Sequence, residues 1–228
     1  MPKGPFRSHV APTVSGRLTT EEAWQAVAEE RVELSALLTD TDMNAWNRQT
    51  PCGDWTVKDV VAHLVVLAEA GNRYGFIARS ALLDPRFHQS IDKAARRLSD
   101  AAQPHELAVR LGAARNGRFL LPLFPAVAAL GEVLVHRLDI SEALGLPAHP
   151  PDERFRVVLD THSKLWFVFG VSRSIRKYRF VATDADWSVG PVDGPVVAAT
   201  GEQLLQIATG RRPLPHLPPR ARSRGWPG

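Results

Sequence analysis

The chain has 228 residues, of which 44% are hydrophobic and 23% charged, values typical of a globular protein with one or two domains. Its single cysteine, Cys52, excludes an internal disulfide, and no apolar run approaches the roughly 18 residues that a membrane-spanning helix requires. The net charge is +4 and the first residues carry no signal-peptide pattern, so we expect a cytoplasmic protein.

The first predicted helix begins after residues 1–18, which we expect to be disordered. Thr19-Thr20-Glu21-Glu22 has the pattern of a capping box, in which a threonine and a glutamate three residues later bind each other's backbone amides. Apolar residues then recur at helical spacing as far as Leu38. The sequence therefore predicts a helix of about five turns, followed by a connection over residues 39–55.

Four further helices are predicted before residue 150, each with a recognisable start. Thr56 can cap the first of them, and Asp84-Pro85 and Gln103-Pro104 place a proline at the first helical position. Gly145 ends the last one and is followed by a proline. The expected ranges are 56 to 71–75, 85 to about 101, 104 to about 119, and 126–144. Amphipathic helices joined by short connections favour a helical bundle.

The pattern changes after Pro150-Pro151. One more helix is expected from Asp152 to about residue 169, and residues 178–183 then alternate as in a β-strand. Two short strands, over 187–190 and 195–199, are separated by an Asp-Gly turn, and a helix capped by Thr200 follows. The predicted units are a disordered N-terminus (1–18), a helical bundle (19–150), a small α+β domain (151–217) and a disordered basic tail (218–228).

The C-terminal segment from residue 211 holds five arginines and no acidic residue. Such a segment could contact nucleic acid. No recognition motif or aromatic-basic surface accompanies it, so we favour a solvated, disordered terminus and do not expect nucleic acid as a partner.

Two predicted helices carry side chains that could share one ligand. His63 lies on the apolar face of the helix that begins at Thr56. On the helix 126–144, Glu132, His136 and Asp139 lie on one face, and a carboxylate four residues before a histidine projects beside it. A histidine from a facing helix would complete a three-ligand metal site with one position open, as in catalytic zinc sites.

Simpler interpretations compete with this hypothesis. A single apolar-face histidine such as His63 is more often a satisfied core residue, and on spacing alone the structural interpretation is favoured. Asp139 could orient a ligand histidine or be an ordinary polar position, and both alternatives stay open. Trp55 is expected to pack, and Cys52 to be a small buried apolar group rather than a reactive thiolate.

Three segments resemble a known protein family, and this resemblance favours the metal site over the structural interpretation. TPCGDWTVKDVVAHL resembles the signature of the actinobacterial mycothiol-dependent maleylpyruvate isomerase family, which belongs to the DinB-like metal-binding bundles. GEVLVHRLDISEALG resembles the second metal motif of that family, and FVATDADWSVG with DGPVVAATGEQLLQIATGRR resembles its small C-terminal domain. The resemblance implies a mainly α fold, a DinB-like four-helix bundle followed by a small sterol-carrier-like α+β domain, and a metal held by His63, Glu132 and His136.

The implied chemistry is that of a thiol-dependent metalloenzyme. Zn²⁺ bound by two neutral histidines and one glutamate keeps a positive charge, and it deprotonates a thiol that occupies the open position. The resemblance implies that mycothiol binds there and attacks a small-molecule electrophile, in an isomerase or thiol S-transferase reaction. The alternatives are a metal-dependent hydrolase and a non-catalytic ligand-binding or metal-sensing protein. Other divalent metals suit the same ligands, no membrane partner is expected, and a homodimer is left open.

Overall fold

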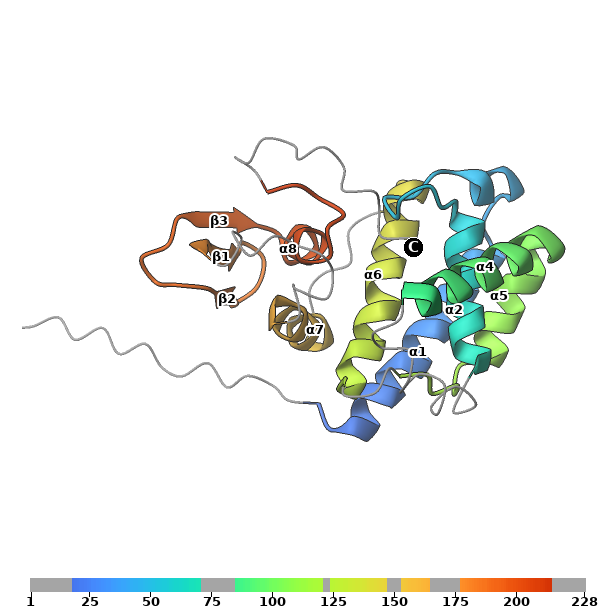
Figure 1. Ribbon diagram of the computed structural model, residues 1–228, viewed down its shortest axis with the longest axis horizontal. Coiled ribbons are helices and arrows are strands. Elements are labelled where there is room, and N and C mark those ends of the chain that lie inside the picture. Colours follow the sequence, from blue (N-terminus) through green and yellow to red (C-terminus); the bar gives the residue numbers. More distant parts are fainter. Residues whose placement is uncertain (1–17, 71–84, 121–123, 147–152, 165–176, 215–228) are drawn as a thin grey trace, which may run out of the picture.

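The computed structural model describes residues 18–70, 85–120, 124–146, 153–164 and 177–214. Figure 1 shows a bundle of helices on one side and a small sheet with two helices on the other. The mainly α fold class with a small sheet is the one that the sequence predicts, and it is confirmed. Within the described ranges, no helix combines the length and apolar character that crossing a membrane requires.

The first helix begins at the predicted cap. Helix α1 (Thr20–Thr39) follows Thr19, whose side chain accepts a hydrogen bond from the amide of Glu22 at 3.2 Å. The Glu22 carboxylate accepts one from the amide of Thr19 at 2.7 Å, so the capping box is complete. A short 3₁₀ helix, η1 (Met43–Asn47), lies in the connection that follows.

The remaining bundle helices start where the caps predict. They are α2 (Val57–Ala70), α4 (Pro85–Ala101), α5 (Pro104–Ala113) and α6 (Ala126–Leu144). Thr56 and Asp59 form a second reciprocal cap at the start of α2. Gly145 ends α6 in the left-handed conformation, at φ 70°, which glycine adopts without steric cost.

Helix α5 is shorter than predicted, because it ends at Ala113 and not near Phe119. The chain turns after Ala114 and crosses close to the end of α2. A Cβ atom at Gly117 would lie 1.8 Å from the carbonyl oxygen of Ala68, so only glycine fits this crossing.

The core of the bundle is formed by α1, α2, α5 and α6, and α4 packs on the outside of α2. The side chains that fill it are almost entirely apolar, and the largest of them that are fully buried include Trp46, Trp55, Leu34, Leu64, Leu107, Leu111 and Leu130. Burial of this apolar area is the main force that holds α2 and α6 together.

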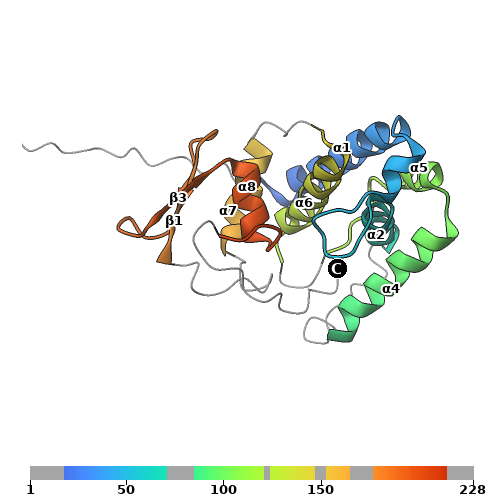
Figure 2. The same ribbon diagram turned by 90° about the horizontal axis from the view of Figure 1, so that it is seen from above.

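The C-terminal unit (residues 153–214) contains α7 (Glu153–Lys164), β1 (Arg179–Ala182), β2 (Ser188–Val189), β3 (Val196–Ala199) and α8 (Gly201–Ala208). The three strands lie where the sequence predicts. The Asp-Gly turn does not join paired strands, however, because the sheet order is β2-β1-β3, with β2 antiparallel and β3 parallel to β1. Figure 2 shows α7 and α8 between this sheet and the bundle.

Several predicted features lie outside the described residues. These are the boundary near Pro150, the disordered segment up to residue 17, the tail 218–228 and the end of the helix expected to reach residue 169. The division of the chain at residue 150 therefore stays a prediction.

The C-terminal unit makes polar and steric contacts with the bundle. Arg154 of α7 pairs with Glu29 of α1, and Gln206 of α8 donates to Glu142 of α6 at 2.7 Å. The imidazole of His162, on α7, packs directly on Gly131 of α6. The unit is thus seated on the same helix that carries Glu132.

The contact at Gly131 predicts a large effect of one methyl group. A Cβ atom at this position would lie 1.9 Å from Cε1 and 2.7 Å from Nε2 of His162. We expect Gly131→Ala to lower the free energy of unfolding by about 1–3 kcal/mol through overpacking, measured by urea denaturation.

The matched control is Gly112→Ala, also within a helix. Its Cβ atom would meet the Ser35 hydroxyl at 2.7 Å, and this terminal group can rotate away at the cost of its hydrogen bond to the carbonyl oxygen of Ala108. The helix propensity of alanine offsets the remaining cost by about 1 kcal/mol. Equal stability of the two variants would contradict the seating of α7 on Gly131.

Candidate metal centre

Helices α2 and α6 bring the three predicted ligand residues together. Nε2 of His63 lies 2.9 Å from Oε1 of Glu132, and Nε2 of His136 lies 3.1 Å from the same oxygen. One ligand atom from each residue falls within 4.8 Å of the others. His63 therefore faces Glu132 and His136 as the spacing on the two helices predicts, and the four-residue separation on α6 places the latter pair side by side.

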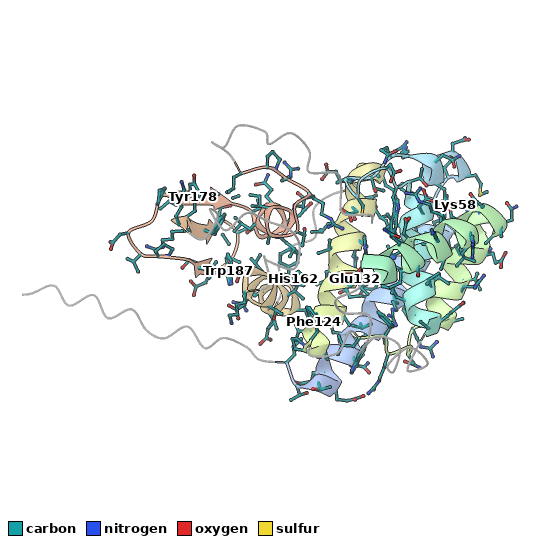
Figure 3. The ribbon with its side chains drawn as sticks, viewed as in Figure 1. Lys58, Phe124, Glu132, His162, Tyr178 and Trp187 are labelled. Atoms are coloured by element: carbon teal, nitrogen blue, oxygen red, sulfur yellow. The ribbon has the colours of Figure 1, made fainter. Side chains whose placement is uncertain are left out.

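The three side chains differ in their access to solvent. His63 and His136 are buried, at 7% and 5% exposure. The Glu132 side chain is 39% exposed, so the carboxylate lies at the mouth of the site. Figure 3 shows Glu132 on α6, the helix that lies between α2 and the α7 helix that carries His162, and its carboxylate reaches His63 of α2. The site consequently has a buried side made of imidazoles and one side that a small molecule can approach.

The electrostatics of the cluster favour one negative and one positive charge. Burial opposes ionisation of Glu132, but hydrogen bonds from His136 and His63 outweigh it and hold its pKa well below the usual range. Burial also opposes the imidazolium of His136, but hydrogen bonds to Asp139 and Glu132 raise its pKa to about 8. Burial lowers the pKa of His63, which is therefore neutral at pH 7.

The donor set fits a divalent cation. Two ring nitrogens converge on one carboxylate oxygen. Loss of the Nε2 proton of His136, and transfer of the His63 proton from Nε2 to Nδ1, would leave both nitrogens as lone-pair donors beside that oxygen. Two imidazoles and one carboxylate are ligands that zinc and other first-row divalent metals accept. Nδ1 of His63 is buried and has no hydrogen-bond partner among the described residues, so this ligand is held less firmly than His136.

Asp139 is fully buried one helical turn beyond His136. Its Oδ2 atom lies 3.0 Å from Nδ1 of His136 and accepts that ring proton. This bond fixes the ring so that Nε2 faces Glu132. The sequence left two alternatives open for Asp139, and the structure shows the contact to the histidine. That this contact orients a metal ligand stays a proposal.

Arg211 is a residue of the site that sequence reasoning missed. It follows α8, and its guanidinium is bound to the carboxylate of Asp139, with Nη2 3.0 Å from Oδ2 and Nε 3.1 Å from Oδ1. Its side chain is only 16% exposed. The interpretation of the segment from residue 211 as a solvated terminus is therefore wrong for Arg211. A contact between residues 72 positions apart leaves no local pattern in the sequence. The one available signal was that Arg211 belongs to the segment DGPVVAATGEQLLQIATGRR, which resembles the C-terminal domain of the family.

Trp55 and Cys52 form the wall behind the histidines. The Trp55 ring centroid lies 5.0 Å from that of His63, and its Nε1 donates to Asp92 of α4 at 3.2 Å. Burial raises the pKa of Cys52 to about 12, although Arg211 opposes this shift. Cys52 is therefore a protonated, buried group, in line with the sequence-based interpretation.

Cys52 also lies within 4.8 Å of ligand atoms of His136 and Asp139, which makes a second geometric candidate for metal binding. The carboxylate of Asp139 is already paired with Arg211, whose Nη2 also lies 3.6 Å from the sulfur of Cys52. A cation at this place would compete with the guanidinium, so we favour the cluster centred on Glu132.

Asp184, in the segment that resembles the family's C-terminal domain, has a structural contact. Its Oδ1 accepts a hydrogen bond from the amide of Gly201 at 2.8 Å, at the start of α8. Trp187 is partly buried and packs against the core of the C-terminal unit. Neither residue contacts the three candidate ligands.

Comparison with known families gives one match. Residues 27–116 match the family described as the mycothiol maleylpyruvate isomerase N-terminal domain, and this confirms the resemblance for that part of the chain. The matched range includes His63 but ends before Glu132 and His136. No curated protein matches the chain.

Two solved structures share the fold. One is described as the crystal structure of the mycothiol-dependent maleylpyruvate isomerase; it is 18% identical, with a TM-score of 0.57 over 86% of this chain and 90% of that chain. The other is a crystal structure of a mutant of that isomerase, with a TM-score of 0.56 over the same shares. The coverage shows that the likeness extends through the bundle and into the C-terminal unit.

The protonation of His136 predicts how metal binding depends on pH. Below its pKa of about 8, an incoming cation must displace one proton, because His63 is already neutral. We expect close to one zinc ion per chain and an affinity that falls about tenfold for each pH unit below 8. Above that pH the affinity should level off. Elemental analysis and chelator competition between pH 6 and 9 measure both, and a flat profile would exclude His136 as a ligand.

The contact between Asp139 and His136 predicts a defined loss of affinity. Asp139→Asn keeps the shape of the side chain but removes the charge that supports the ring proton and pairs with Arg211. We expect zinc affinity to fall by roughly 10-fold to 100-fold, measured by the same competition. Asp92→Asn, a carboxylate that contacts Trp55 and none of the ligands, is the matched control and should keep the affinity of the parent protein.

Proposed function

We propose that this chain, whose residues 27–116 match the mycothiol maleylpyruvate isomerase N-terminal domain, is a metal-dependent enzyme that uses mycothiol as a nucleophile. The observation that carries the proposal is the convergence of His63, Glu132 and His136 at a site with one exposed side. His63 lies inside the matched domain, and α6 supplies the other two residues.

The residues present set the role of each group. A divalent cation held by the three side chains would supply the positive charge that deprotonates a thiol at neutral pH. Asp139 holds the His136 ring by its Nδ1 proton, so that Nε2 stays directed at the ligand position. Trp55 and the buried side of the two imidazoles exclude water from behind, which leaves the Glu132 side as the route for thiol and substrate.

Arg211 makes the C-terminal unit part of the proposed site. Its guanidinium keeps Asp139 ionised and lies 3.6 Å from the sulfur of Cys52, on the same side of His136. The Asp139 carboxylate binds Nε and Nη2 of the guanidinium through both oxygens, so the pair is close to neutral. We infer that Arg211 acts on the site by positioning Asp139 and His136.

The reaction that fits these groups is addition of a thiol to an electrophilic double bond. The similar solved structures are named for maleylpyruvate, which carries a cis double bond conjugated with carbonyl groups. The thiolate adds to one carbon, a proton is taken up at the other, and the resulting single bond rotates. Loss of the proton and of the same thiolate then gives the trans isomer, so the thiol is not consumed. In the S-transferase variant the adduct is the product.

The test is a comparison of thiols and electrophiles on zinc-loaded protein. We expect turnover of a cis-unsaturated dicarbonyl substrate with mycothiol and little with glutathione, followed by ultraviolet absorbance and mass detection of adducts. A hydrolase would instead consume thiol conjugates without needing free thiol. A metal-sensing protein would bind zinc and show no turnover with any member of the panel.

Arg211→Gln is the informative variant for this proposal. We expect zinc affinity to fall by about tenfold or less, and kcat/KM for the anionic substrate to fall by about 100-fold even when the site is saturated with zinc. The matched control is Arg212→Gln, the neighbouring, more exposed arginine, which binds Gln206 and Glu142 and none of the candidate ligands. Equal losses in both variants would mean that Arg211 only holds the C-terminal unit in place.

A further inference from the structure

A second polar cavity lies at the end of the bundle where α1 begins and where α2 and α5 end (Figure 1). Its volume is about 120 Å³. One wall is the first two turns of α1 and the other is the turn after α5; together they contribute Glu21, Trp24, Gln25, Ala28, Arg115, Asn116, Gly117 and Arg118. None of these residues belongs to the candidate metal centre, so the two sites can be tested independently.

A buried arginine sets the orientation of this turn. Arg31 lies on the same face of α1 as Trp24 and Ala28, and it is only 3% exposed. Its Nη1 donates to the carbonyl oxygen of Arg115 at 3.0 Å and to that of Gly117 at 2.6 Å. Both carbonyls are thus drawn inward, toward the helix and away from the surface.

The inward carbonyls turn two amides outward. In a planar trans peptide the C=O and the next N–H point in opposite directions. The amides of Asn116 and Arg118, which follow the two bound carbonyls, therefore point away from the Arg31 guanidinium. Neither amide donates a hydrogen bond within the part of the chain that the structure describes. Neighbouring outward N–H groups of this kind form anion-binding concavities.

The charges around the cavity have the same sign. Arg115 and Arg118 line it and Arg31 lies beneath, whereas Glu21 supplies the single carboxylate among the lining residues. Arg31 has no carboxylate partner in the described ranges, and burial lowers its pKa to about 10, so it is still charged at pH 7. Three cations against one anion leave an excess positive charge at the turn.

We propose that this cavity is a binding site for a small oxyanion, the phosphate or carboxylate group of a ligand. Its principal donors are the guanidiniums of Arg115 and Arg118, which line the cavity. The amides of Asn116 and Arg118, which donate no hydrogen bond among the described residues, belong to the same turn. A volume of about 120 Å³ accommodates an anion of a few heavy atoms. The Arg118 guanidinium already lies 5.8 Å above the Trp24 ring, which offers an apolar surface to the organic part of such a ligand. The excess charge favours a dianion, so phosphate should bind more tightly than acetate.

Glu21 is the built-in competitor for the same donors. Its Oε1 accepts a hydrogen bond from Nη2 of Arg118 at 2.5 Å, at the edge of the cavity. An incoming oxyanion must displace this exposed carboxylate. Removal of the Glu21 charge should therefore strengthen anion binding, an effect that damage to the fold could not produce.

The test is calorimetric titration of the full chain with inorganic phosphate, acetate and chloride at constant ionic strength. We expect saturable 1:1 binding of phosphate, weaker binding of acetate and none of chloride. The double variant R115Q/R118Q, at two exposed positions, should bind phosphate at least about tenfold more weakly, and Glu21→Gln several-fold more tightly. Arg97→Gln, an exposed arginine on α4, is the matched control and should leave binding unchanged.

Two outcomes overturn the proposal. If the parent protein shows no saturable phosphate binding, the turn is only a cap on the end of α5. If R115Q/R118Q and Arg97→Gln weaken binding equally, or Glu21→Gln does not strengthen it, the effect is general charge screening. Circular dichroism and thermal unfolding without phosphate verify that each variant is folded before its affinity is compared.

Discussion

One carboxylate shared by two imidazoles is the interaction on which the site depends. Glu132 alone would be a partly desolvated negative charge on a mainly apolar helix, and His63 alone would be a buried base without a partner. Together they satisfy one another, but only while α2 and α6 remain side by side. The apolar core of the bundle supplies that constraint, so the precision of the polar cluster derives from the packing around it.

The second constraint comes from outside the bundle. Arg211 contacts Asp139, and Asp139 contacts His136, so a residue after α8 is linked to the centre through two hydrogen-bonded steps. The seating of His162 on Gly131 and the pairing of Arg154 with Glu29 hold α7 in the same relation to α6. Neither half of the chain alone therefore presents the full set of charges around His136.

The sequence predicted what is local and missed what is distant. Capping residues located the starts of α1 and α2 and the end of α6, and helical spacing placed Glu132 beside His136, because these are short-range effects of backbone geometry. The end of α5 was misplaced because Gly117 is needed only where the chain crosses Ala68. The sheet order and Arg211 depend on contacts between remote segments, and an arginine near a terminus has no local signal that it is buried.

The state of Cys52 has a consequence for a protein proposed to work with thiols. With a pKa of about 12, only on the order of one molecule in 10⁵ carries the thiolate at pH 7. Thiol–disulfide exchange requires a thiolate and access to solvent, and Cys52 offers neither. The chain can therefore sit in a pool of small thiols and their disulfides without forming mixed disulfides, and its one sulfhydryl stays inert under oxidative conditions that would inactivate an exposed cysteine.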